Sequence, residues 1–141
     1  MHKQRLAILI VAGIGMLATF MPWGKSIITG TIDGTQEAMG WITFLLFSIP
    51  LTYSLLGNRT NTLKKTPLYV ALIAGIIPAL LGLFSIIYVS IFLNSEIDSG
   101  SLDSQLYSVS FGFGLYLTVI AGIAIPIVAI INKDNPSPQK I

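Results

Sequence analysis

The side chains that could carry out chemistry are few in this sequence. The only histidine is His2, at the start of the chain, and there is no cysteine. Zinc or haem sites built on imidazole, and metal or disulfide sites built on thiolates, therefore lack their ligands. No serine has a histidine partner other than the terminal one, and no P-loop or dinucleotide fingerprint is present. We expect a protein that is not an enzyme, with no catalytic residues, metal or cofactor.

The acidic residues form two small groups. Glu96, Asp98 and Asp103 could be read as a cation site, but their spacing follows no known calcium loop, and we interpret them as a solvated acidic loop. Asp33 and Glu37 could be imagined as an acid and a base, but nothing in the sequence fixes a geometry between them. Neither group predicts a reaction.

The distribution of charged residues along the chain predicts the helices that flank these acidic groups. Only 10% of the 141 residues are charged and 53% are hydrophobic, whereas soluble domains carry about 25% charged residues. A charge at mid-membrane would cost about 2.5–3.5 kcal/mol on insertion scales. The charged residues leave four uncharged stretches, each near or above the roughly 18 residues of a spanning helix. These stretches are Leu6–Gly24, Ala38–Asn58, Thr66–Ser95 and Ser104–Asn132.

The fold class that follows is an all-α membrane protein with a four-helix transmembrane bundle. We expect one domain, residues 1–132, and a disordered cytoplasmic tail, residues 133–141. A cleaved signal peptide is the alternative for the first helix, but no Ala-x-Ala arrangement lies near its end. The expected helices are about 6–22, 40–56, 68–93 and 107–131.

The first external loop allows two interpretations. Ile27, Ile28, Thr31 and Ile32 favour extended structure, and Asp33-Gly34 is a good turn pair, so a small β-like lid over the bundle is one of them. The other is an irregular loop whose isoleucines rest on the membrane surface.

The basic residues predict the orientation. Seven of the eight lysines and arginines fall in the N-terminal segment, the loop between the second and third helices, and the tail, and only Lys25 falls on the other side. By the positive-inside rule both termini are cytoplasmic, and the protein is integral to the cytoplasmic membrane. We interpret these residues as topology signals rather than as a nucleic-acid patch, so we expect no nucleic-acid partner.

Two rows of small residues predict where helices pack closely, because lipid gives no hydrophobic drive for helix association. Aromatic residues near the helix ends predict positions at headgroup depth. The expected helix-packing residues are Ala71, Gly75, Ala79 and Gly82 in the third helix and Gly114, Thr118 and Gly122 in the fourth. The expected membrane-interface residues are Trp23, Trp41, Tyr69 and Tyr88.

Three short motifs carry a resemblance. Pro22-Trp23 closes the first helix, Gly40-Trp41 opens the second, and Gly112–Leu117 lies on the last. The pattern resembles small uncharacterised bacterial four-helix membrane proteins. The layout is also similar to that of claudin-like tetraspan proteins, whose longer first external loop is strand-forming and carries a cysteine pair that this chain lacks. The resemblance implies an interaction or structural role and transfers no functional residue.

These observations favour a protein that works by helix-face contacts, as an accessory, assembly or scaffold subunit. We expect it to contact membrane lipids and either another membrane protein or a second copy of itself. One alternative is a carrier or pore for a neutral or lipid-like substrate, hinged at Pro50, Pro78 and Pro126. Another is an immunity protein that shields the membrane from a toxin. A small multidrug exporter would need a membrane-embedded glutamate in its first helix, which is absent here.

Overall fold

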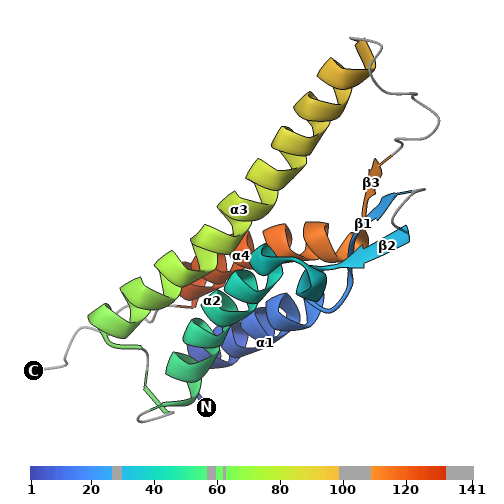
Figure 1. The fold of residues 1–141 in the computed structure, drawn as a ribbon. Coiled ribbons are helices and arrows are strands. Elements are labelled where there is room, and N and C mark those ends of the chain that lie inside the picture. The colour runs from blue at the N-terminus through green and yellow to red at the C-terminus, as the bar shows by residue number, and fades with distance from the viewer. Residues whose placement is uncertain (27–29, 57–59, 62, 99–108, 133–141) are drawn as a thin grey trace, which may run out of the picture.

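Four helices and a small sheet make up the described part of the chain (Figure 1). The structure is a computed structural model, and it describes residues 1–26, 30–56, 60–61, 63–98 and 109–132. The helices are α1 (Lys3–Ala18), α2 (Ala38–Leu55), α3 (Lys65–Asp98) and α4 (Phe113–Ile131). The strands are β1 (Pro22–Ser26), β2 (Gly30–Asp33) and β3 (Val109–Phe111), and a short 3-10 turn, η1 (Gly34–Gln36), follows β2.

Three of these helices are long and apolar enough to cross a membrane. Within the described residues the candidate spans are Ala38–Leu55, Lys65–Ile91 and Phe113–Ile131. α1 has 16 residues, which corresponds to about 24 Å of helix, somewhat less than the roughly 30 Å of a hydrocarbon core. The expectation of a mostly helical chain is therefore confirmed, and three of its four described helices could cross a membrane.

The small β structure of the first loop is also confirmed. β1 pairs antiparallel with β2 on one side and with β3 on the other, giving the order β2-β1-β3. Lys25 faces Thr31 across one ladder and Ser110 across the other. Because β3 directly precedes α4, this sheet joins two connections that are far apart in the sequence. The Asp33-Gly34 pair does mark a turn, because Asp33 ends β2 and Gly34 begins η1. It is not the turn between β1 and β2, which falls on residues 27–29, outside the described part.

The helix ends differ from the predicted bounds for local reasons. α1 stops at Ala18 instead of continuing to about residue 22, because Pro22 and Trp23 belong to β1. α4 begins at Phe113 rather than near residue 107, because the three residues of β3 pair with the free edge of β1. α3 starts earlier and ends later than predicted. Pro67 is tolerated in its first turn, and no glycine or proline follows Gly82 before the helix ends at Asp98.

The core of the bundle is built largely from small side chains. One buried cluster contains Ala12, Phe47, Ala121 and Ile125, contributed by α1, α2 and α4. Gly15 allows the Phe47 ring to lie against α1, since a Cβ at this position would come within 2.7 Å of the ring. Such close backbone approach is how helices associate when lipid provides no hydrophobic drive.

α3 packs along only part of its length. Its buried residues end at Gly82, and in the described stretch 83–91 every side chain is half-buried or exposed. In Figure 1 the C-terminal turns of α3 rise clear of the other helices and extend past the sheet. The helix bundle therefore has a closed end, near the N-terminus, and a sheet end, where α3 diverges from its neighbours.

Candidate functional site

The row of small residues on α3 lies against α4. Ala71, Gly75, Ala79 and Gly82 are all buried. A Cβ on Gly75 would lie 2.9 Å from the Ile125 side chain, and one on Gly82 would lie 2.6 Å from Val119 Cγ2. Substituents larger than hydrogen would push the two helices apart.

The residues of the α4 row divide between two neighbours. A Cβ on Gly122 would lie 2.7 Å from the Gly75 carbonyl oxygen and 2.8 Å from Ala79 Cβ, so Gly122 meets the α3 row. Gly114 does not, because its free side faces the Ala18 carbonyl oxygen at the end of α1. Thr118 is buried and donates its hydroxyl to the Gly114 carbonyl oxygen of its own helix at 2.9 Å. The small residues are thus used for packing within one copy of the chain.

The aromatic residues expected at the membrane interface occupy two kinds of environment. Trp41, Tyr69 and Tyr88 are 51%, 62% and 59% exposed, so their rings lie on the outside of the chain. Trp23 instead lies half-buried in β1, and its indole N–H donates to the Ala18 carbonyl oxygen at 3.1 Å. A Cβ on Gly34 would lie 2.6 Å from the Trp23 ring, so this ring is clamped between the end of α1 and η1.

Glycines fix the sheet to the ends of the helices. Gly112 donates its N–H to the Trp23 carbonyl oxygen at 2.8 Å, and a Cβ on Gly112 would collide with the Pro22 carbonyl. A Cβ on Gly40, in the first turn of α2, would collide with the Gly34 carbonyl in the same way. The sheet therefore lies over the ends of α1 and α4, and η1 lies over the start of α2, so that together they form a roof over these helices.

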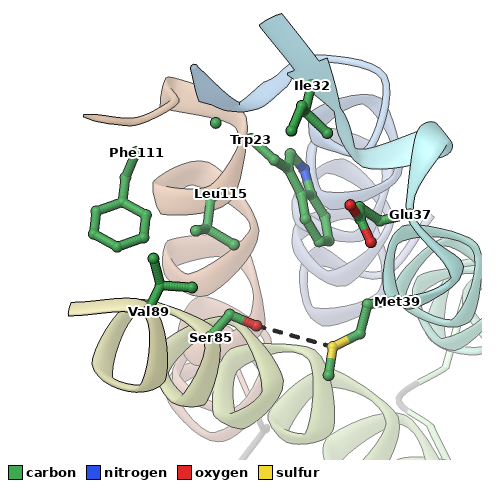
Figure 2. Close-up of a pocket in the computed structure, with 9 residues that line it drawn as sticks. Trp23, Ile32, Glu37, Met39, Ser85, Val89, Phe111 and Leu115 are labelled. Carbon is green, nitrogen blue, oxygen red and sulfur yellow. Dashed lines mark hydrogen bonds between the residues drawn. The ribbon is translucent and has the colours of Figure 1, made fainter. Parts of the chain in front are cut away.

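A cavity opens between this roof and the diverging part of α3. It has a volume of about 270 Å³ and is lined by residues from all three strands and from α2, α3 and α4. Figure 2 shows Trp23 and Ile32 on the roof side, Leu115 on α4, and Ser85 and Val89 on α3. Apolar groups make up most of the wall. No motif in the sequence predicts this cavity, because its walls come from segments that meet only in the folded chain.

Glu37 supplies the one carboxylate among the described residues that line the cavity. It is exposed, and it lies immediately before α2, in the N-cap position, but its side chain makes no capping hydrogen bond. In Figure 2 the carboxylate lies beside the Trp23 ring. A negative charge at a helix N-terminus is favourable, because the helix dipole presents its positive end there.

Ser85 contributes no free hydroxyl to this cavity. Its Oγ donates to the Leu81 carbonyl oxygen of its own helix at 2.9 Å and approaches Met39 Sδ at 3.9 Å. Among the described residues, no three histidine, aspartate or glutamate side chains come together as a metal site would require. Glu96 and Asp98 have no described side chain, and Asp103 lies outside the described residues. The cavity thus offers an apolar wall and one anionic rim.

A second polar site, at the closed end, was not recognised in the sequence. Arg5 was expected only to signal topology, yet it is 5% exposed. Its guanidinium donates to the carbonyl oxygens of Leu56 at 2.6 Å and Asn61 at 2.8 Å, with longer contacts of 3.4 Å to those of Tyr53 and Ser54. These carbonyls include the unpaired ones at the end of α2, so Arg5 caps that helix with a positive charge.

Gln4 extends the same site to α4. Its buried amide donates to the Ala129 carbonyl oxygen at 2.6 Å and accepts from the Leu63 N–H at 3.1 Å. Gln4 and Arg5 together therefore connect α1 to α2, to α4 and to the segment before α3. Their position directly before the apolar run beginning at Leu6 was the available signal, since polar side chains there must find partners once they are buried.

Compared with protein-family models, curated proteins and solved structures, this chain matches none.

Proposed function

We propose that the protein is an integral protein of the cytoplasmic membrane with four crossing helices and both termini in the cytoplasm. The closed end holds Lys3, Arg5, Lys64 and Lys65, whereas the sheet end holds the acidic residues Asp33 and Glu37 and a single described basic residue, Lys25. This distribution supports an orientation with the sheet outside, by the positive-inside rule. α1 would complete its crossing with the turn that connects it to β1.

Within that arrangement, the protein acts by contact, as a non-enzymatic accessory or scaffold subunit. The observation that carries this proposal is the diverging segment of α3, residues 83–91. The small-residue rows are used internally, so a partner must bind an outer face. On the diverging segment Phe84 and Tyr88 stack with ring centroids 5.9 Å apart and are about equally exposed. Rigid aromatic pairs of this kind are the usual anchors of protein interfaces.

The partner proposed for this face is an apolar helix of another membrane protein. Ile87 and Ile91 are 56% and 64% exposed on the same segment, and they would continue the contact along α3.

Site-specific photocrosslinking in cells tests this proposal. A photoreactive phenylalanine analogue is placed at Ile87, and in a matched control at Ile10, which is 53% exposed on α1. We expect a discrete protein adduct from position 87, lost when Phe84 and Tyr88 are both changed to alanine, and only lipid adducts from position 10. Lipid adducts alone at both positions, with a monomer in mild detergent, would contradict the proposal.

A further inference from the structure

We propose that the cavity beneath the sheet binds a single-chain amphiphile whose head group carries an ammonium, with its chain in the cavity and its head beside Glu37. The site requires no partner protein, so it is independent of the docking role proposed for α3. Three features of the structure support it: the size of the cavity, its position and its charge.

The size suits one alkyl chain rather than a bulky ring system. A volume of about 270 Å³ corresponds to roughly nine waters at about 30 Å³ each, below the usual range of drug-like pockets. A continuous apolar wall with so few polar groups gives bound water too few partners, which favours an apolar occupant.

The position gives access from lipid. The cavity lies between the sheet and the described stretch 83–91 of α3, in which no side chain is buried. Ser85 and Val89 form its α3 wall, and both lie beyond Gly82, where α3 leaves the bundle. An amphiphile already in the membrane could therefore enter sideways between α3 and the sheet, without first passing through water.

The charge selects the head group. Glu37 is the carboxylate among the described lining residues, and it is not engaged in capping α2. Asp33, at the end of β2, adds a second negative charge to the same end of the molecule, where Lys25 in β1 is the one described basic residue. An ammonium would be attracted to this rim, and a carboxylate or sulfate head would be repelled.

Trp23 provides a direct readout, because it lines the cavity and the chain has only one other tryptophan. In the Trp41→Phe variant, in mild detergent, 12-bromododecylamine should quench Trp23 fluorescence with a saturable component that unbrominated dodecylamine reverses. 12-Bromododecanoate should show no such component. In the Trp23→Phe variant, the remaining Trp41 should show only the linear quenching expected of a ring exposed to the micelle.

Two serines on α3 give a matched pair of variants that tests where the probe binds. Ser85 lines the cavity and Ser90 does not, while each hydroxyl donates to a carbonyl of its own helix, at 2.9 and 2.7 Å. Ser85→Phe should remove the saturable quenching, and Ser90→Phe should leave it unchanged. Glu37→Gln, an exposed change that leaves the core intact, should weaken binding of the amine about two- to fivefold, the range expected for a solvent-exposed ion pair.

Several results would overturn the inference. These are quenching of Trp23 that rises linearly with the probe, equal binding by Ser85→Phe and Ser90→Phe, or equal affinity for the amine and the carboxylate. An unchanged amine affinity in Glu37→Gln would also overturn it. None of these results bears on the crosslink expected from Ile87, so the two proposals can fail separately.

Discussion

Replacing Arg5 by alanine should destabilise the bundle far more than removing any other terminal charge. The side chain is 5% exposed and bridges the end of α2 and the segment before α3. Its two short hydrogen bonds, of 2.6 and 2.8 Å, are to the carbonyl oxygens of Leu56 and Asn61. The two contacts at 3.4 Å, to Tyr53 and Ser54, are too long to add much.

The size of the effect follows from these two bonds. A hydrogen bond to a charged group contributes about 1.5–3 kcal/mol, so Arg5→Ala should lower the free energy of unfolding by about 3–6 kcal/mol. Arg5→Lys keeps the charge but loses the fork of the guanidinium, so we expect about half of that loss. Lys3 is exposed on the same helix, and Lys3→Ala removes the same charge at a cost within about 0.5 kcal/mol.

Reversible unfolding in mixed detergent micelles, followed by circular dichroism, measures these differences. The comparison of Arg5→Ala with Lys3→Ala separates a capping role from a topology signal, since both variants lose one N-terminal positive charge. If the two variants unfold within about 1 kcal/mol of each other, Arg5 does not cap α2 as described and the reasoning is refuted.

Three further changes follow from the same geometry. Gly122→Ala should lower the free energy of unfolding by about 1–3 kcal/mol, because the added Cβ would lie 2.7 Å from the Gly75 carbonyl oxygen. Gly13→Ala is the matched control: a Cβ there would have nothing within 4 Å, so the change should be neutral or stabilising. Unfolding of both variants in micelles measures the difference. Gln4→Ala should destabilise by about 1–3 kcal/mol, because the Leu63 N–H and the Ala129 carbonyl lose their partner; a loss no larger than that of Lys3→Ala would contradict it. Gly112→Ala should weaken the contact between the sheet and α4, because the added Cβ would collide with the Pro22 carbonyl. Amide hydrogen exchange across the β1–β3 ladder should then be faster. Unchanged exchange would contradict this prediction, because it would mean that the Pro22 carbonyl moves aside without disturbing the ladder.

The helical part of the fold could be read from the sequence because charge is costly in lipid. The uncharged stretches located all four helices, and the isoleucines and threonines of the first loop indicated its strands. These signals are local, since each depends only on the composition of one segment. The helix ends depend on contacts outside each segment. Pro22 and Trp23, for example, end α1 because they belong to β1, which pairs with β2 and β3.

The features that the sequence does not predict depend on contacts between segments that are far apart in the chain. Val109–Phe111 looks like the start of an apolar helix until the free edge of β1 is available to it. Arg5 looks like a topology signal until the end of α2 supplies carbonyls for its guanidinium. The cavity depends on the angle at which α3 leaves the bundle, and no single stretch of residues encodes that angle. The sequence shows Glu37 as an acidic residue of the first loop, but it does not show that Glu37 lies on a cavity.

We propose that the chain crosses the membrane four times, with the sheet outside and the closed end inside. Since the chain has no cysteine, single cysteines at two exposed positions, Thr31→Cys in β2 and Asn61→Cys before α3, can report on each side. A membrane-impermeant maleimide applied to intact cells should label the cysteine at position 31 and reach the one at position 61 only after permeabilisation. Labelling of position 61 in intact cells, with position 31 protected, would contradict the account.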